Sequence, residues 1–168
     1  MNNLTDLEAQ RVFMRYLTLC LFTMVPPQRG QVYFNCYIDK KMPNANYVDT
    51  KKGLLHITEY KTKRSYGDRE IKLPTELNNL IKDWKTITNC KTSLLLCNSS
   101  GQKMSSQSFT QFVNNIFDKN VSTDMIRKVY VTHMLKKGLS KEDQKKLAYL
   151  LGHSLKVMLN FYNKDFNV

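Results

Sequence analysis

The sequence predicts an α+β fold that is mainly helical and contains one small antiparallel sheet. Apolar residues recur at helical spacing over most of the chain, and between residues 47 and 73 this spacing gives way to the alternation typical of strands. The 168 residues are 42% hydrophobic and 24% charged, which is typical of a globular protein. A chain of this length can bury a substantial core as one domain. We therefore expect residues 1–168 to fold as a single domain.

The first predicted element is a helix that ends near Thr23. Thr5 and Glu8 have the spacing of a capping box, in which the two side chains bind free backbone N–H groups of the first turn. Apolar residues then follow at helical spacing. Pro26 and Pro27 end the pattern, because a proline disfavours helical geometry in the residue before it.

The next segment predicts a short helix and then the sheet. The helix is expected from about Gln28 towards Ile38, and a loop follows over residues 40–46. Short alternating segments, separated by turns that contain glycine, then predict a three-stranded antiparallel meander. The three strands are expected at residues 47–49, 54–60 and 69–73.

The rest of the chain predicts helices. Pro74 is favourable at a helix start, and an apolar stripe continues from there to Trp84. A short apolar stretch at residues 94–96 ends at a turn, and Ser140 has the position of an N-cap. The remaining helices are expected at residues 105–117, 122–136, 140–150 and 155–161.

The balance of charge indicates a polyanionic partner. The chain contains 26 Lys and Arg against 14 Asp and Glu, which gives a net charge of +12 and a pI near 9.6. Nucleic acid is the usual partner of so basic a domain, although the Lys- and Asn-rich composition of an AT-rich genome gives a similar excess. No predicted helix is both basic and strongly amphipathic, and no apolar run is long enough to cross a bilayer. We expect an intracellular protein without membrane contact.

The cysteines indicate neither a metal site nor a disulfide framework. Cys20, Cys36, Cys90 and Cys97 form no CxxC pair, and no histidine lies at zinc-finger spacing from them. Cys20 and Cys36 lie in apolar surroundings typical of small core residues. We expect a reducing compartment and no structural metal.

Five side chains are candidates for a chemical role. Arg29 follows the double proline at a helix start, Lys61 heads the basic tip of a predicted hairpin, and Arg127 lies inside an otherwise apolar helix. His153 and Tyr162 follow near the end of the sequence. Each has a simpler structural interpretation, such as helix capping, a solvated lysine or a core tyrosine. Their significance therefore depends on their combination.

The combination resembles a known family. Residues 127–135, RKVYVTHML, resemble the R-H-T-F-A-T-H-L-L helix of the tyrosine recombinases, the phage and bacterial integrase family. Residues 151–154, LGHS, followed by Tyr162 resemble the L-G-H-S…Y ending of that family at its usual spacing. Arg29 and Lys61 stand where the family's first arginine and its hairpin lysine are expected, although Lys63 competes with Lys61.

The resemblance covers nearly the whole chain and implies a single helical catalytic domain of the tyrosine-recombinase type. It also implies that the separate N-terminal core-binding domain, which these recombinases usually carry, is absent. The chain would cleave and rejoin DNA through a covalent 3′-phosphotyrosine intermediate, without a metal, ATP or another cofactor. The expected partners are double-stranded DNA and further protomers in a tetrameric synapse on that DNA.

The family also implies a role for each candidate residue. Arg29 and Arg127 would hold the non-bridging phosphate oxygens and stabilise the charge that grows on them. His153 would donate a further hydrogen bond to the phosphate, and Lys61 would protonate the departing 5′-oxygen or contact a base in the minor groove. Tyr162 would be the nucleophile. Further DNA contacts are expected from Lys63, Arg64, Lys128 and His133.

Two departures from the family keep alternatives open. Asp124 stands where the family usually has His or Lys, and an anion there would repel a phosphate. We therefore expect Asp124 to point elsewhere or to orient a neighbouring residue. The sequence also lacks the glutamate that usually follows the first arginine, and its Pro-Pro-x-Arg form resembles integrases of eukaryotic DNA viruses and mobile elements. Such a protein would act on DNA in the host nucleus or cytoplasm, or travel in a virion.

Two other functions remain compatible with the sequence. A relaxing enzyme like the type IB topoisomerases would use the same chemistry without choosing a sequence. A basic DNA-binding module that has lost activity would explain Asp124 directly. Formation of a covalent DNA adduct separates this last possibility from the other two.

Overall fold

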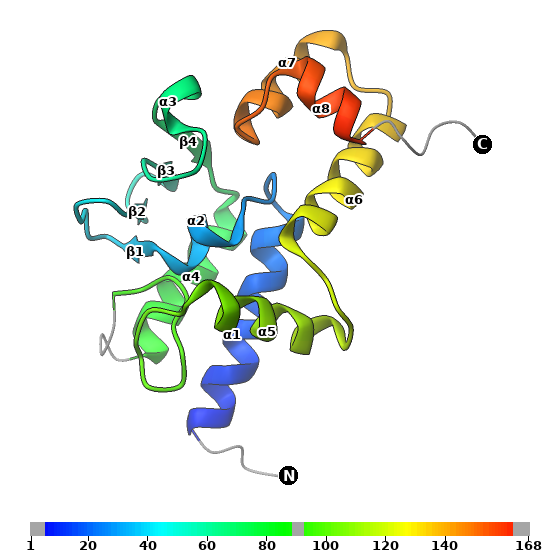
Figure 1. Cartoon of the computed structure of the whole chain (residues 1–168). Coiled ribbons are helices and arrows are strands. Elements are labelled where there is room, and N and C mark those ends of the chain that lie inside the picture. Colours follow the sequence, from blue (N-terminus) through cyan, green and yellow to red (C-terminus); the bar gives the residue numbers. More distant parts are fainter. Residues whose placement is uncertain (1–5, 89–92, 163–168) are drawn as a thin grey trace.

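The computed structural model describes residues 6–88 and 93–162, and for Phe161 and Tyr162 it describes the backbone alone. Over these residues the chain is mainly helical and carries a four-stranded sheet, as Figure 1 shows. The elements are α1 (Asp6–Thr23), α2 (Gly30–Phe34), β1 (Cys36–Ile38), β2 (Asn46–Asp49), β3 (Leu54–Ile57), α3 (Lys63–Tyr66), β4 (Arg69–Lys72), α4 (Thr75–Ile87), α5 (Ser106–Phe117), α6 (Thr123–Lys136), α7 (Lys141–Leu150) and α8 (Leu155–Tyr162).

The sheet has one strand more than the sequence predicts. Its order is β1-β2-β3-β4, with β1 parallel to β2 and the other pairs antiparallel. The helix expected to run towards Ile38 ends at Phe34, and Cys36–Ile38 forms β1 instead. Cys36 and Ile38 are buried while Tyr37 between them is less so, which is the alternation of a strand. The segment is too short for this alternation to be recognised from sequence.

The second predicted strand is shorter than expected. It was predicted to reach Tyr60, but β3 ends at Ile57. The side-chain oxygen of Asn46 accepts hydrogen bonds from the backbone N–H groups of Thr58 and Glu59, both at 2.9 Å. These amides are satisfied outside the strand ladder, so the chain leaves the sheet and forms the short helix α3 before β4.

The helices of the second half agree with the prediction because their starts are encoded locally. Ser105, Ser122 and Ser140 each accept a hydrogen bond from a backbone N–H group of the first turn of α5, α6 and α7. The predicted Thr5 cap and Cys90 lie outside the described residues. Cys20, Cys36 and Cys97 are buried and free.

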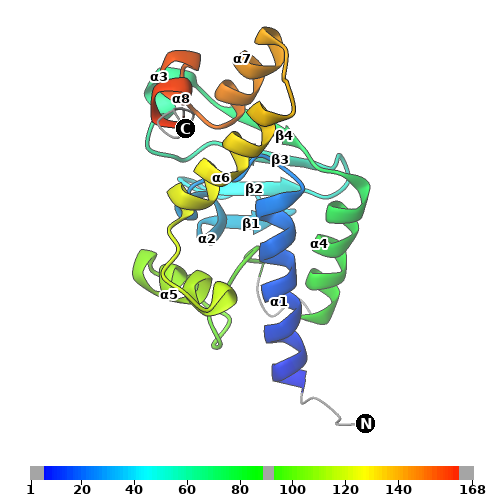
Figure 2. The ribbon, with the colours of Figure 1, turned by 90° about the vertical axis from the view of Figure 1, so that its right-hand side faces the viewer.

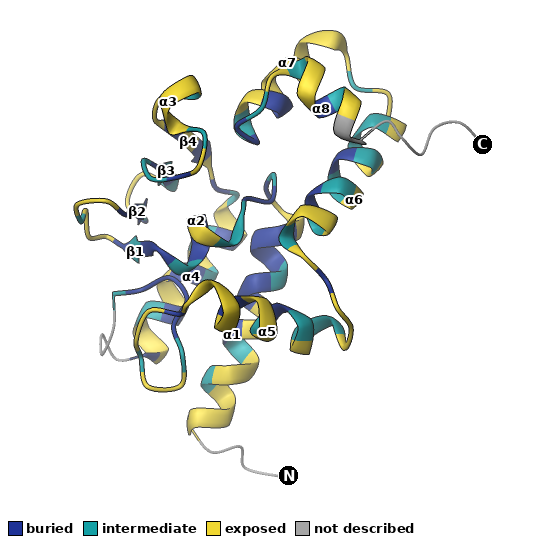
Figure 3. Ribbon diagram, in the orientation of Figure 1, coloured by how far each residue is buried: buried dark blue, intermediate teal, exposed yellow. Residues whose placement is uncertain are grey.

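Two hydrophobic clusters divide the described chain. The larger cluster joins α1, α2, α4 and α5 to the sheet, and Figure 2 shows α1 and α4 side by side. We call residues 6–117 the sheet region. The smaller cluster consists of Val131, Leu147, Ala148, Leu151 and Met158, all on α6, α7 and α8 or the turn between the last two. We call α6–α8 the C-terminal helical group, which stands beside the sheet region in Figures 1 and 3.

Candidate active site

Two arginines from different regions meet at one carboxylate oxygen. Arg29 occupies the N-cap position of α2, two residues after the double proline, and Arg127 lies on α6. Asp124 Oδ1 lies 3.8 Å from Arg29 Nε and 3.1 Å from Arg127 Nη1. Asp124 therefore contacts both arginines, which agrees with the second of its two expected roles, that of orienting its neighbours. A group with negatively charged oxygens at this position is bound by both guanidinium groups.

Arg127 also fixes His153. The Arg127 side chain is 1% exposed, and its Nη2 lies 2.8 Å from both the Leu151 carbonyl oxygen and His153 Nε2. A guanidinium N–H group only donates, so Nε2 of His153 accepts this bond and the ring proton lies on Nδ1. Burial, followed by the positive charges of Arg127 and Arg29, lowers the pKa of His153 to about 4. The imidazole is consequently uncharged at neutral pH.

Lys61 faces the same hollow as the first arginine. It is exposed and lies in the connection between β3 and β4, in a turn that precedes α3. Together with Arg29 and Asp124 it lines a hollow of about 460 Å³. Lys63 instead contacts Asp68 at 3.5 Å. This placement favours Lys61 over Lys63 as the hairpin lysine.

The structure places the helix that carries Tyr162, but the Tyr162 side chain lies outside the description. Tyr162 is the last residue of α8. This helix packs against α6 and α7, and Met158 on α8 is fully buried in the smaller cluster. The helix of the proposed nucleophile is thus anchored to the helix that carries Arg127.

The other predicted DNA contacts lie at the surface. Arg64 on α3 and His133 on α6 are exposed, whereas Lys128 on α6 is half-buried. Lys103 was missed by the sequence analysis. It lines the same hollow as Arg29, and its Nζ donates a hydrogen bond to Asn35 Oδ1 at 2.6 Å. Its sequence context, a lysine in a polar loop, gives no signal of this position.

A buried arginine on the sheet was also missed. Arg69 on β4 is 2% exposed, and its guanidinium stacks over the Tyr60 ring at 4.1 Å. Its Nη1 donates to the carbonyl oxygens of Leu150 and Tyr149 at the end of α7. A sequence signal existed, because strand alternation puts residue 69 on the same face as the buried Ile71.

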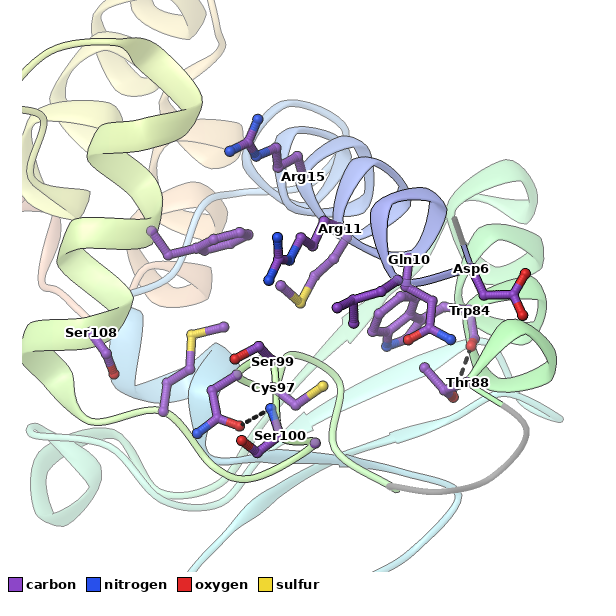
Figure 4. A pocket seen from close by; sticks show the side chains of 16 residues that line it. Asp6, Gln10, Arg11, Arg15, Trp84, Thr88, Cys97, Ser99, Ser100 and Ser108 are labelled. Carbon is purple, nitrogen blue, oxygen red and sulfur yellow. Dashed lines mark hydrogen bonds between the residues drawn. The ribbon is translucent and has the colours of Figure 1, made fainter. Parts of the chain in front are cut away.

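The larger cavity lies away from these groups. It measures about 590 Å³ and is lined by α1, α4, α5 and the loop before α5, as Figure 4 shows. Met14, Trp84, Met104 and Phe112 give it apolar walls, and Arg11 and Arg15 come from α1. Because phosphate requires cationic and N–H donors in convergent positions, the smaller hollow beside Arg29 is the better candidate site.

The described residues contain neither a candidate metal-binding cluster nor a helix that could cross a membrane. Within residues 6–88 and 93–162, no three His, Cys, Asp or Glu side chains are grouped so that they could hold a metal ion. In the same residues, no helix has both the length and the apolar character needed to span a membrane.

Comparison with known proteins gives a family and a set of structural neighbours. The model of the phage integrase family matches residues 42–167. The crystal structure of XerA recombinase aligns with a TM-score of 0.66 at 13% identity, over 96% of this chain and 58% of that one. XerH site-specific recombinase, in a post-cleavage complex with its difH substrate, aligns with a TM-score of 0.61 at 18% identity, over 98% of this chain and 45% of that one.

A third neighbour is the Tn1549 transposon integrase in complex with transposon right end DNA. It aligns with a TM-score of 0.57 at 17% identity, over 92% of this chain and 58% of that one. At these identities the similarity shows a shared fold. The chain spans about half the length of these proteins. No curated protein sequence matches the chain.

Proposed function

Because the chain belongs to the phage integrase family of tyrosine recombinases, we propose that it is a site-specific DNA recombinase or integrase that cleaves and rejoins DNA through a 3′-phosphotyrosine on Tyr162. The observation that carries this proposal is the meeting of Arg29 and Arg127 at one oxygen of Asp124. Two guanidinium groups that converge on one anionic oxygen form a site suited to a phosphodiester. Residues 1–168 would act as the catalytic domain.

The arginine pair supplies the electrostatic part of the reaction. When a phosphodiester enters this position, its oxygens replace the oxygen of Asp124 as the partners of both arginines. Arg127 is held from behind by the Leu151 carbonyl oxygen, so its guanidinium is oriented before DNA arrives. Arg29 is less constrained, since its side chain is 31% exposed. The pair thus combines one fixed donor and one adaptable donor.

His153 completes the group on the side of Arg127. In the DNA-free protein, its Nε2 accepts a hydrogen bond from Arg127 and has no proton to offer. Donation from Nε2 to a phosphate oxygen requires that the ring gain a proton or change tautomer. The negative charge of the phosphate favours this change, because it opposes the arginine charges that lower the pKa of His153.

Tyr162 and Lys61 would carry the bond changes. The Tyr162 hydroxyl gives its proton to solvent, and its oxygen forms a bond to phosphorus while the bond from phosphorus to the 5′-oxygen breaks. Lys61 donates a proton to that departing oxygen. The phosphotyrosine keeps the energy of the phosphodiester, so the reverse reaction rejoins the strand without ATP. This scheme assigns no step to a metal or another cofactor.

Double-stranded DNA is the proposed substrate and partner. The net charge of +12 supports it, and XerH and the Tn1549 integrase were both solved with DNA. Lys63, Arg64, Lys128 and His133 are proposed to contact the duplex. We also propose that the protein assembles with further protomers into a tetrameric synapse on DNA, in the host nucleus or cytoplasm.

Covalent trapping tests the proposal. The protein is incubated with nicked duplexes that contain a randomised segment, because a nick releases the 5′-product and prevents rejoining. The mixture is then denatured and examined for a protein–DNA adduct. Wild-type protein should form the adduct, and Tyr162→Phe should bind duplex DNA without forming it. Tyr16→Phe, which alters an exposed tyrosine on α1, is the matched control and should form it normally.

The same experiment distinguishes the alternatives. An adduct that persists in Tyr162→Phe would refute the nucleophile. Duplex binding without any wild-type adduct would indicate a DNA-binding module that has lost activity. Relaxation of supercoiled plasmid with no recombinant product would indicate an enzyme of the topoisomerase type.

A further inference from the structure

Four consecutive carbonyl groups at the end of α7 are bound by side chains from three other parts of the chain. Arg69 Nη1 donates to the carbonyl oxygen of Leu150, and to that of Tyr149 at 3.4 Å. Arg127 Nη2 donates to the Leu151 carbonyl oxygen at 2.8 Å, and Thr62 Oγ1 donates to that of Gly152 at 3.1 Å. Gln28 adds a second bond to the Leu150 carbonyl oxygen, with its Nε2 at 3.0 Å.

The physical need for these contacts comes from the end of the helix. The last carbonyl groups of a helix lack partners within it and carry the negative end of its dipole. Leu151, which is 2% exposed, and Gly152 are buried just after α7, so protein donors replace water at these carbonyl groups. Two buried guanidinium groups satisfy the carbonyl oxygens and balance the partial charge. No carboxylate of the described residues lies within ion-pair distance of Arg69.

Gly152 makes the approach of Arg69 possible. Its φ is +70°, and a Cβ atom at this position would lie 3.2 Å from Cζ and Nη2 of Arg69. Any side chain here would therefore be strained in its backbone and would press on the guanidinium. The lack of a side chain at Gly152, in the LGHS motif, thus leaves room for the buried guanidinium of Arg69. The same glycine also ends the helix.

Two of the groups that bind this turn are next to proposed catalytic residues, and a third, Arg127, is itself one. Gln28 precedes Arg29, and Thr62 follows Lys61. His153 follows Gly152, whose carbonyl group is bound. Arg69 contacts Gln28 as well, since Nη1 lies 3.3 Å from Gln28 Oε1. The position of the α7–α8 turn therefore sets the relative positions of residues from both regions of the molecule.

We propose that Arg69 is a positioning residue for DNA cleavage, which holds the α7–α8 turn against the sheet so that His153 and α8 face the arginine pair. Arg69 is buried and contacts no bound phosphate in this role; it acts through the turn. The inference depends on the proposed function for its consequence in catalysis. Its structural part, the placement of His153, is measurable without DNA.

Two variants of Arg69 test the proposal. Arg69→Lys keeps the positive charge but not the planar fork, and Arg69→Met removes both. The rate of adduct formation at saturating nicked duplex should fall by about 10²-fold in Arg69→Met, because an error of about 1 Å in catalytic geometry has such an effect. Arg69→Lys should show an intermediate rate. The Kd for duplex DNA should change by less than about threefold in both, since the buried guanidinium is not a phosphate contact.

The His153 ring provides the readout that is independent of cleavage. NMR titration of the DNA-free protein should show the pKa of His153 rising from about 4 towards 6.5 in Arg69→Lys, as the turn moves away from Arg127. The comparison uses the lysine variant because it retains the charge near the ring. If wild-type protein formed no adduct, the proposed function would fail while this titration would still decide the role of Arg69.

Controls separate positioning from charge and from general stability. Lys85→Met removes a cation that pairs with Asp39 at 2.8 Å, and it should leave rate, affinity and titration unchanged. If Arg69→Met does not fold, Thr62→Val replaces it, with about a fivefold slower rate from the loss of one hydrogen bond. Its matched control is Thr18→Val, which removes a buried hydroxyl within α1.

The proposal is overturned by a wild-type rate in Arg69→Lys and Arg69→Met. It is equally overturned if duplex affinity falls by as much as the rate, because Arg69 would then be a DNA contact. An unchanged His153 titration in Arg69→Lys would show that the turn does not depend on the guanidinium.

Discussion

In the sheet region, helices and strands share one continuous apolar core, whereas the separate cluster of the C-terminal helical group contains five buried apolar residues among the side chains that the structure describes. The two regions meet partly through Ile126 and Leu150, which pack against the larger core. They also meet through polar contacts, in which Arg69 and Arg127 bind carbonyl groups and Asp124 binds Arg29. Arg29, Arg127 and His153 lie along this polar interface.

The contrast between the apolar cores and the polar interface gives a reason for a site at the interface. Apolar packing fixes a shape but offers no charge, and each buried polar group needs a partner. At the interface, Arg127, which would bind phosphate, also satisfies the Leu151 carbonyl group just after α7. Since hydrogen bonds can be exchanged for others of similar strength, a phosphate can replace Asp124 without opening either core. The two apolar cores thus keep their packing, while the polar contacts between them can change.

The largest expected effect comes from one truncation in each core. Leu55 on β3 is fully buried and pairs with Val48 and Ile71, so Leu55→Ala should lower the free energy of unfolding by about 2–5 kcal/mol. Met158→Ala removes an equally buried side chain from the smaller cluster. We expect its effect to be local, with faster hydrogen exchange in α7 and α8 and unchanged exchange in β2 and β3. Chemical denaturation and hydrogen-exchange mass spectrometry measure the two effects.

An exposed neighbour provides the control for this pair. Val157→Ala lies beside Met158 on α8, but Val157 is 47% exposed and should have little effect. If Met158→Ala weakened protection in the sheet as much as Leu55→Ala, the two regions would form one cooperative unit. The distinction between them would then be one of packing and not of stability.

The sequence predicted the parts of the fold that are encoded locally. The helices of the second half were predicted nearly residue by residue, with Ser140 as a cap, and the structure shows that Ser105 and Ser122 cap two of them as well. The short strand β1 was missed, because its three residues gain strand geometry from pairing with β2 and not from their own pattern. The early end of β3 depends on Asn46, a partner from a neighbouring strand that no local rule identifies.

The same distinction holds for the candidate site. Arg127, His153 and Tyr162 lie within one stretch whose order resembles a family motif, and Arg29 and Lys61 were located by their position relative to helices and strands. Strand alternation gave a signal for the burial of Arg69, but not for its partner, and the partners of Arg69 and Gln28 are 81 and 122 residues away along the chain. An arginine in a short strand reads as solvent-exposed unless its buried partner is known.

A smaller effect is expected from the ion pair that crosses the interface. Asp124→Asn removes the charge that Arg29 and Arg127 share while keeping the size of the side chain. Duplex DNA should then bind about tenfold more tightly at low salt, because one negative charge near a phosphate in partly exposed surroundings costs about 1 kcal/mol or slightly more. Fluorescence anisotropy with a short labelled duplex, repeated at increasing salt, measures the change.

The control for Asp124→Asn must change the net charge equally. Asp118→Asn does so at the end of α5, where the left-handed backbone, with a φ of 51°, also suits asparagine. If both variants tightened binding to the same extent, the gain would come from net charge alone. Asp124 would then not compete with phosphate for the arginine pair.

The smallest expected effect is the pH dependence that His153 brings to the interface. Its pKa is lowered from 6.5 in the unfolded chain to about 4 in the folded protein, so the folded state favours the uncharged ring. As the pH falls from 6.5 to 4, the unfolded state takes up a proton that the folded state resists, and the free energy of unfolding decreases. We expect a loss of about 1 kcal/mol, because the ring is only half-buried and solvent reduces the full effect.

In His153→Gln this part of the pH dependence of the free energy of unfolding should disappear. It should persist in His133→Gln, which removes an exposed histidine of α6 but leaves His153 in place. Denaturation of the three proteins between pH 7 and pH 4 measures the slopes, and equal slopes for wild type and His153→Gln would mean that the ring does not sit against Arg127 in solution.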